Sequence, residues 1–113
     1  MTRVGSRVIK VPDTPEYWSP VSFEIFGINP DDGPPKNIAE FLLHVHPDDR
    51  EAVGRARAEI FPKGLVFDYK YRIVRPNGDV RLIRDVGSPV SEGGVVKRYV
   101  GAWMENHRLR ATD

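Results

Sequence analysis

The hydrophobic and polar positions change their period near residue 65. Before that point, short apolar runs recur at helical spacing; after it, apolar and polar residues alternate, as they do along half-buried strands. Two blocks of strands around a block of helices predict an α+β domain: a five-stranded antiparallel sheet with short helices and one longer helix packed on one face. The pattern predicts strands near 8–11 and 16–18, helices over 19–27, 37–45 and 46–61, and strands over 66–74, 80–90 and 95–104.

Residues that favour helix ends and tight turns separate these elements. Ser19-Pro20 supplies a hydroxyl cap and a proline at the first helical position, and Asn37 is placed to cap the next helix. Pro62 and Gly64 are expected to stop the longest helix. Asn77-Gly78 provides the two residues that a tight hairpin needs between the next two strands.

The last predicted strand carries apolar residues on both of its faces. Simple alternation places Tyr99 and Trp103 on one face and Val96 on the other. A strand of this kind is covered on both sides, so we expect it to be central in the sheet. Gly87 in the preceding strand is a candidate bulge. The acids of the sheet strands fall on the polar phase or at a turn, so none is expected in the core: Asp68, Asp79 and Asp85.

The composition narrows the classes of protein to which the chain can belong. With 113 residues, we expect one domain over 1–113, with its core at about 7–105 and a polar tail at 106–113. A net charge of +1 does not indicate a nucleic-acid or membrane partner, and no segment approaches the roughly 20 apolar residues of a membrane span. We therefore expect a cytoplasmic domain. The absence of cysteine excludes disulfides and cysteinyl-flavin photochemistry.

Four segments, in their order and spacing, resemble the PAS family. They are Trp18-Ser19-Pro20 with Glu24-Ile25-Phe26-Gly27, Val45-His46-Pro47-Asp48-Asp49-Arg50, Tyr71-Arg72-Ile73-Val74-Arg75-Pro76-Asn77-Gly78-Asp79-Val80-Arg81, and Tyr99-Val100-Gly101. The resemblance covers about residues 16–104. It is greatest to the PAS subgroup with a His-Pro-Asp-Asp motif, which is common in bacterial sensor histidine kinases and cyclic-dinucleotide enzymes.

The resemblance implies a sheet whose concave face is covered by helices, often with a ligand pocket between them. Such domains bind haem, flavin, organic acids or no visible ligand, and they dimerise and signal to a kinase, cyclase or other effector domain. The resemblance also implies that His46, Pro47, Asp48 and Asp49 are a structural motif, in which His46 caps or packs the long helix. Relatives end the last strand with Asp-Ile-Thr, where this chain has Glu105-Asn106-His107. This departure lies where relatives connect to their signalling helix.

Aromatic residues of the strands are the most suggestive candidates for a site. On one face of a sheet they would meet apolar residues of the helices and enclose a small pocket, with tyrosine hydroxyls as its polar groups. Plain core packing explains the same residues, so both interpretations stay open. If a pocket exists, Tyr71 or Tyr99 points between the sheet and the long helix. The candidate pocket residues are Phe26, Phe41, Val53, Ile60, Phe67, Tyr69, Tyr71, Tyr99 and Trp103.

The remaining side chains suggest little chemistry. The long helix has no histidine beyond its first residue, so haem is not expected, whereas a noncovalent flavin or a small metabolite stays open. Asp48, Asp49 and Glu51 crowd the first helical turn, where acids stabilise the helix dipole. No metal site and no catalytic residue is expected.

The function predicted from these features is that of a sensory or interaction module of a bacterial signalling protein. We expect a homodimer that binds a small ligand or a partner domain and relays its state to an effector. One alternative is a purely structural dimerisation module with a filled core. The other is a small α+β enzyme, which a buried acid among the apolar positions would indicate.

Overall fold

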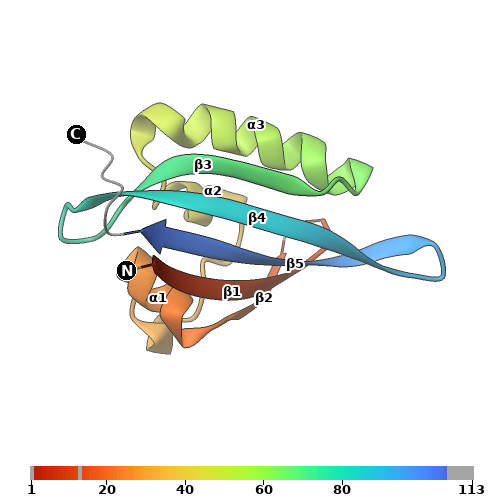
Figure 1. Cartoon of the computed structure of the whole chain (residues 1–113), viewed down its shortest axis with the longest axis horizontal. Coiled ribbons are helices and arrows are strands. Elements are labelled where there is room, and N and C mark those ends of the chain that lie inside the picture. Colours follow the sequence, from red (N-terminus) through yellow and green to blue (C-terminus); the bar gives the residue numbers. More distant parts are fainter. Residues whose placement is uncertain (1, 13, 107–113) are drawn as a thin grey trace.

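A twisted five-stranded sheet forms the frame of the molecule, and the computed structural model describes residues 2–12 and 14–106 (Figure 1). The strand order is β2-β1-β5-β4-β3, and every neighbouring pair is antiparallel. β5 is central, as its two apolar faces predict. The strands are β1 (Thr2–Lys10), β2 (Thr14–Trp18), β3 (Phe67–Val74), β4 (Val80–Glu92) and β5 (Val95–Asn106).

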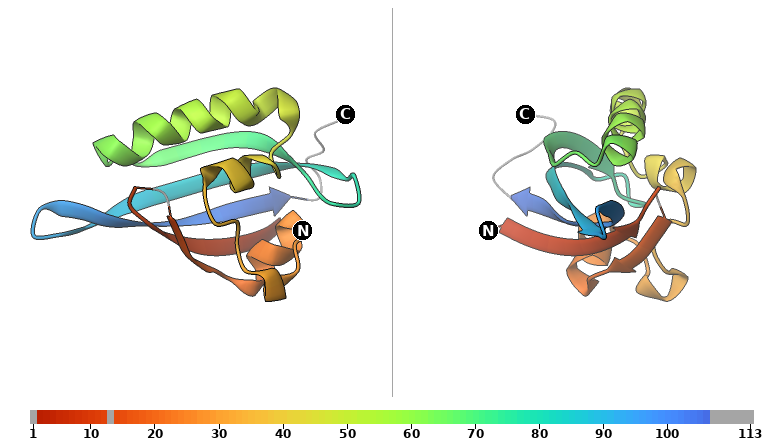
Figure 2. Two further views of the ribbon diagram at one scale, coloured as in Figure 1. Left: turned by 180° about the vertical axis from the view of Figure 1, so that it is seen from behind. Right: turned by 90° about the vertical axis from the view of Figure 1, so that its right-hand side faces the viewer.

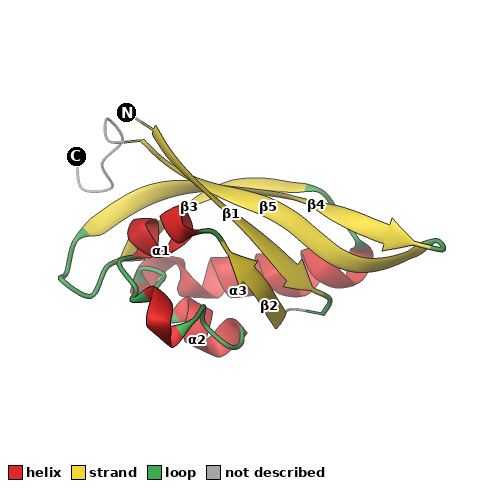
Figure 3. Ribbon diagram, turned by 90° about the horizontal axis from the view of Figure 1, so that it is seen from below, coloured by secondary structure: helices red, strands yellow, loops and turns green. Residues whose placement is uncertain are grey.

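The helices all lie on one face of this sheet, as Figures 2 and 3 show, so the α+β fold class is confirmed. The long helix α3 runs along β3, α1 lies against β1, and α2 packs against α3 (Figure 1). The helices are α1 (Pro20–Phe26), the 3-10 turn η1 (Pro30–Asp32), α2 (Ile38–Leu42) and α3 (Pro47–Lys63).

The predicted capping residues of the helices are confirmed with one exception, in α1. The Asn37 side chain accepts a hydrogen bond at 2.9 Å from the amide three residues on, and His46 Nδ1 accepts one at 3.1 Å from the amide two residues on. Ser19 does not cap α1; its Oγ accepts from the Ser6 amide at 2.8 Å and connects the helix start to β1. Gly64 ends α3 in a left-handed conformation, as predicted, whereas Pro62 lies within the last turn of the helix.

The pairing of β4 with β5 changes the predicted face of Val96 and removes the predicted bulge at Gly87. The register shifts once near Val96, and this irregularity brings Val96 onto the helix-covered face with Tyr99, whereas simple alternation had separated the two. Gly87 is not a bulge, since it pairs regularly with Phe67 and Gly101. A β-carbon on Gly87 would collide with the Phe67 ring, so the glycine makes room for that aromatic side chain.

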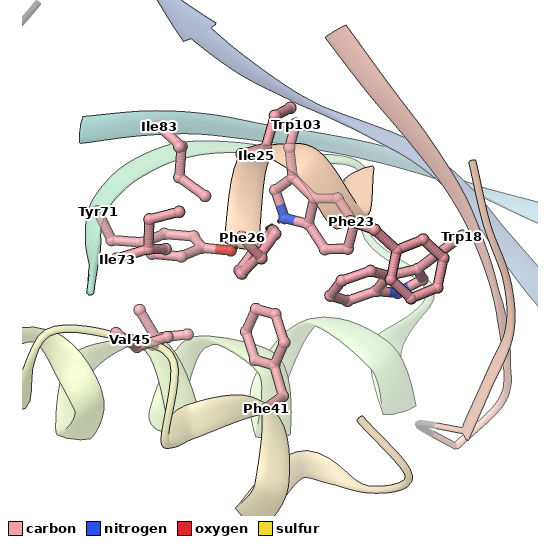
Figure 4. Packing of buried hydrophobic residues seen from close by; sticks show 11 residues of the cluster. Trp18, Phe23, Ile25, Phe26, Phe41, Val45, Tyr71, Ile73, Ile83 and Trp103 are labelled. Atoms are coloured by element: carbon pink, nitrogen blue, oxygen red, sulfur yellow. Dashed lines mark hydrogen bonds between the residues drawn. The ribbon is translucent and has the colours of Figure 1, made fainter. Parts of the chain in front are cut away.

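Two groups of buried side chains fill the space between the sheet and the helices. The smaller group lies under the C-terminal half of α3 and consists of Ile9, Phe61, Phe67 and Tyr99. The larger group lies under α1 and α2 (Figure 4), and its aromatic rings pack around Trp103 with centroid distances of 4.7 Å to Trp18 and 4.8 Å to Phe26. Its members are Trp18, Phe23, Ile25, Phe26, Phe41, Val45, Val53, Tyr71, Ile73, Ile83 and Trp103.

Candidate ligand-binding site

A buried chain of polar groups crosses the inner face of the sheet. Arg7 on β1 is 2 % exposed and its Nη2 donates to Oδ1 of Asp85 on β4, which is 0 % exposed. The Tyr71 hydroxyl donates to Asp85 Oδ2 at 2.6 Å, and Trp103 Nε1 donates to the same hydroxyl at 3.1 Å. The expectation that no acid of the sheet is buried is therefore wrong for Asp85. Both oxygens of Asp85 accept a hydrogen bond, one from Arg7 and one from Tyr71. The carboxylate therefore compensates the buried charge of Arg7.

A glycine next to Arg7 makes space for this arrangement. Arg7 pairs with Gly101 of β5, and a β-carbon on Gly101 would lie 3.4 Å from Arg7 Cζ and 2.5 Å from the Val86 carbonyl oxygen. The guanidinium lies close to the central strand, with its Cζ 4.1 Å from the centroid of the Trp103 ring. This cation–π contact and the ion pair with Asp85 hold the charge of Arg7 inside the domain.

A second arginine reaches the same region from α3. Arg57 is 6 % exposed, and its Cζ lies 4.5 Å from the Phe41 ring centroid and 5.1 Å from that of Phe61. A charged side chain on a helix ordinarily faces solvent. It lies on the inner face because it is one helical turn from Val53 and one from Phe61, and both of these are buried.

A narrow cleft opens beside these charges, between the inner face of the sheet and the α2 region. Its volume is about 20 Å³, roughly the room that one water molecule needs. The walls come from β1, β2, β5, the segment before α2, α2 itself and α3. The residues that line the cleft are Arg7, Ile9, Pro15, Trp18, Pro35, Asn37, Phe41, Arg57 and Trp103.

The structure divides the predicted pocket residues between this cleft and the core. Phe41 and Trp103 line the cleft. Phe26, Val53 and Tyr71 pack in the larger core group. Phe67 and Tyr99 belong to the smaller group, with Ile60 packed against it and Tyr69 against both groups. The Tyr99 hydroxyl donates to the Ile60 carbonyl of α3 at 3.2 Å, so the prediction that one of the two tyrosines points between sheet and long helix is confirmed.

Burial keeps the tyrosines of this region protonated. Desolvation raises the pKa of Tyr69 to about 12, and the negative charge of Asp85 adds to this shift while Arg57 opposes it. Desolvation also raises the pKa of Tyr71 well above 10, with Asp85 again contributing. Both hydroxyls are therefore neutral hydrogen-bond donors near pH 7.

A second buried carboxylate closes the C-terminal end of β5. Glu105 is 1 % exposed, and its Oε1 accepts from Arg3 Nε at 2.9 Å. Its Oε2 accepts from Arg75 Nη2 at 2.7 Å and lies 3.3 Å from Arg81 Nε. Arg75 also donates to the Ile25 carbonyl of α1 at 2.8 Å. The hairpin arginines Arg75 and Arg81 thus converge on Glu105.

The His46-Pro47-Asp48-Asp49 motif opens α3 and makes hydrogen bonds within its own turn and to β3. The His46 amide donates to the Arg72 carbonyl of β3 at 2.9 Å, in addition to the cap that its ring provides. Asp49 accepts from the Arg72 amide at 2.9 Å and from Arg72 Nε and Nη2 at 2.9 and 2.8 Å. These bonds lower the pKa of Asp49. The motif therefore fastens the first turn of α3 to the edge strand of the sheet.

Sequence reasoning missed Arg7, Arg57, Asp85 and Glu105 as inner-face residues, although signals for two of them were present. Asp85 is two residues from the buried Ile83, and strict alternation from that residue places it on the inner face. Arg57 follows Val53 by four residues, which is the helical repeat. For Arg7 and Glu105, the charged type of the residue argued for the solvent face and outweighed the pattern.

Comparison with known proteins identifies the fold and the family. A family model described as the PAS fold matches residues 15–103. The chain is a PAS domain. The N-terminal domain of a diguanylate cyclase with PAS/PAC sensor from Marinobacter aquaeolei has a TM-score of 0.78 at 22 % identity, over 88 % of this chain and 92 % of that one.

Two further solved structures are similar to this PAS domain. A sensory box histidine kinase/response regulator from Burkholderia thailandensis E264 is 29 % identical, with a TM-score of 0.69 over 91 % of this chain and 76 % of that one. A domain of a putative light and redox sensing histidine kinase from Haloarcula marismortui has a TM-score of 0.72 at 18 % identity, over 92 % and 90 % of the two chains. The search of curated protein sequences found no match.

The described part of the PAS domain has neither a metal-binding cluster nor a helix suited to a membrane. Among residues 2–12 and 14–106, no three histidine, aspartate or glutamate side chains are grouped so that they could hold a metal ion. Within the same residues, no helix has both the length and the apolar character needed to cross a membrane.

Proposed function

We propose that this PAS domain is the sensory or interaction module of a bacterial signal-transduction protein. It binds a small ligand or a partner domain and relays its state to an effector such as a kinase or a cyclase. The observation that supports this function best is the cleft beside Arg7, because it brings buried charged groups next to an open space on the inner face of the sheet. Similar domains occur in proteins named as a diguanylate cyclase and as histidine kinases.

The central strand β5 offers a path from the cleft to the end of the domain. Trp103 lines the cleft, and Glu105 lies two residues further along the same face of the strand. A ligand that shifts Trp103 would act on β5 close to the contacts of Glu105 with Arg3 and Arg75. We propose that the Glu105 cluster is the output end of the domain, in place of the Asp-Ile-Thr ending of relatives.

Native mass spectrometry with an absorption spectrum, on protein purified from its own host, tests the sensory role. We expect no flavin or haem absorption, because a cleft of about 20 Å³ has no room for either group. A colourless added mass would identify a small metabolite, for which the cleft must widen. A flavin or haem spectrum would contradict this expectation. Neither colour nor added mass would favour the structural dimerisation module with a filled core.

We propose that the domain is not an enzyme. A buried acid would indicate an enzyme, and Asp85 is such an acid, but its surroundings do not suit proton transfer with a bound substrate. Asp85 is held by Arg7 and Tyr71 through both of its oxygens. It does not line the cleft, so no oxygen of this carboxylate is placed to exchange a proton with a ligand there. The cytoplasmic location stays a prediction, which fractionation of the host cells would test.

We also propose that the domain forms a homodimer through the outer face of its sheet. This face carries exposed valines on neighbouring strands, with Val4 53 % and Val100 45 % exposed. Sedimentation at several concentrations should show a dimer that Val100→Asp shifts toward the monomer. Leu43→Asp is the matched control, since Leu43 is 66 % exposed but lies at the end of α2, on the helix-covered side of the sheet. Equal effects of the two substitutions would count against this interface.

A further inference from the structure

Two tryptophans and a tyrosine form a continuous row through the larger core group (Figure 4). The ring centroids of Trp18 and Trp103 are 4.7 Å apart, and Trp103 Nε1 donates to the Tyr71 hydroxyl at 3.1 Å. Both distances are usual for packed aromatic rings and for hydrogen bonds. Trp18 also lines the cleft, so the outer end of the row lies at an opening in the domain. An electron therefore has a short route between the buried tyrosine and this opening.

The inner end of the row is a tyrosine with a carboxylate beside it. The Tyr71 hydroxyl donates to Asp85 Oδ2 at 2.6 Å, which is the length of a charge-assisted bond to an ionised carboxylate. The Tyr99 hydroxyl donates to the Ile60 carbonyl at 3.2 Å, and a backbone carbonyl is a far weaker base. Within the described part of the chain, no other tyrosine hydroxyl donates to a carboxylate. Tyr71 is thus the tyrosine with a proton acceptor in place.

This acceptor matters because a phenol that loses an electron becomes a strong acid. Before oxidation, the proton stays on Tyr71, since desolvation, and after it the charge of Asp85, raise the pKa of the hydroxyl well above 10. After the loss of an electron, the proton needs to move only along the 2.6 Å bond to Asp85 Oδ2. The electron and the proton therefore leave Tyr71 in different directions, one toward Trp103 and the other toward Asp85.

The charge of Arg7 determines which residue of the row keeps the oxidised state. Its Cζ lies 4.1 Å from the centroid of the Trp103 ring, so a positive charge on the indole is repelled. Oxidised Tyr71 is neutral once its proton has moved, and it avoids this repulsion. The same proton transfer neutralises Asp85 and ends its ion pair with Arg7, which costs free energy. Oxidation of Tyr71 therefore requires a strong oxidant.

We propose that Tyr71 is a one-electron redox site, which a small oxidising radical oxidises by way of Trp18 and Trp103. The radical gains one electron and becomes an anion. The O–H bond of Tyr71 breaks, and its proton forms a new O–H bond with Asp85 Oδ2. The products in the protein are a neutral phenoxyl radical at Tyr71 and a protonated Asp85. This inference goes beyond the proposed function, since it needs neither a ligand in the cleft nor an effector.

Pulse radiolysis of the full chain with azide radicals tests the inference. The absorptions of the indolyl and phenoxyl radicals are followed with time after the pulse. We expect the indolyl signal to decay while the phenoxyl signal grows, at a first-order rate that does not depend on the protein concentration. Because Asp85 takes the proton inside the domain, the rate should not depend on the buffer concentration. The rate should fall in heavy water, since an O–H bond breaks.

Three variants identify the residues concerned. Tyr71→Phe should abolish the intramolecular growth of the phenoxyl signal. Tyr99→Phe is the matched control: Tyr99 is also buried, at 1 % exposure, but it has no carboxylate partner among the described residues, so the conversion should proceed as in the original chain. Asp85→Asn should slow the conversion at least about tenfold, because it removes the proton acceptor. If Tyr71→Phe or Asp85→Asn does not fold, the buffer and heavy-water measurements on the original chain decide.

The inference fails if the phenoxyl signal grows unchanged in Tyr71→Phe, since another tyrosine would then be its source. It fails equally if Tyr99→Phe loses the signal to the same extent as Tyr71→Phe. A rate that rises with the buffer concentration, or that is the same in heavy water, would show that Asp85 does not take the proton. None of these results bears on the proposed sensory function, which native mass spectrometry tests separately.

Discussion

Replacing Asp85 with asparagine tests whether the buried ion pair holds the inner face of the sheet together. The substitution keeps the shape of the side chain and removes its charge, while Arg7 remains 2 % exposed over the Trp103 ring. Breaking a buried pair by neutralising one partner costs about 3–5 kcal/mol, because the other charge is left uncompensated. Domains of this size have unfolding free energies of about 5–15 kcal/mol. We therefore expect Asp85→Asn to remove a large part of the stability.

Urea unfolding followed by tryptophan fluorescence measures this loss, since Trp18 and Trp103 both lie in the core. With a slope of about 1–3 kcal/mol per molar urea, the midpoint should fall by at least about 1 M. Asp68→Asn is the matched control. Asp68 also pairs with an arginine, at 2.8 Å from Arg84 Nε, but both side chains are about half exposed. Such a surface pair contributes little, so the control midpoint should hardly move.

A loss below about 1 kcal/mol for Asp85→Asn would refute the reasoning, since it would mean that Arg7 keeps its charge in the core without this carboxylate. A double variant sharpens the test. Arg7→Met with Asp85→Leu removes both charges, and apolar replacement of a buried pair is often neutral or stabilising. The double variant should therefore be more stable than Asp85→Asn. A double variant that is less stable would show that packing, rather than charge, dominates at this position.

Three further predictions concern a close approach and two titrating groups. Gly5→Ala should lower the thermal midpoint of the domain, because the new β-carbon would lie 2.7–2.8 Å from backbone atoms of Ser22. Gly54→Ala in α3 should raise the midpoint, because its β-carbon meets only the Leu42 side chain, at 3.3 Å. The reverse order of the two midpoints would contradict this prediction. The pKa of Asp49 is lowered by its bonds to Arg72, so its contribution to stability is complete above its unfolded pKa of about 3.9 and is lost as the pH falls through the folded pKa. Asp49→Asn should flatten the curve of unfolding free energy against pH in this acidic range. An unchanged slope would refute the assignment to Asp49. Burial lowers the pKa of His44, so the unfolding free energy should fall as the pH drops below about 6.5 toward the folded pKa. His44→Gln should remove this pH dependence. If the pH dependence persists in the variant, other groups cause it.

Period and capping residues predict much of the architecture, because they act within a few neighbouring positions. The change of period separated helices from strands, and the two apolar faces of β5 predicted its central place in the sheet. Asn37 and His46 cap their helices as their sequence positions predict. These contacts depend only on residues two or three positions away, so the tertiary structure leaves them unchanged.

The inner-face charges could be predicted only in part, because their partners lie far away in the sequence. Arg7 and Asp85 are 78 positions apart, and Arg3 and Glu105 are 102 positions apart. A buried charge is disfavoured unless a partner compensates it. When each strand is considered by itself, the sequence therefore favours the solvent face for all four of these charged residues. The pairing of β1 with β5 and of β5 with β4 brings the partners together.

The sequence by itself determined the class of fold, the order of the elements and the family, since these follow from local patterns and short motifs. Only the tertiary structure decided which side chains lie on the inner face of the sheet and which of them border a cleft. It divided the predicted aromatic pocket into packed core and one small cleft, and it placed Arg7, with two donors unsatisfied among the described residues, at the wall of that cleft. The physical reason is that burial and hydrogen-bond satisfaction depend on the strands and helices that meet in space.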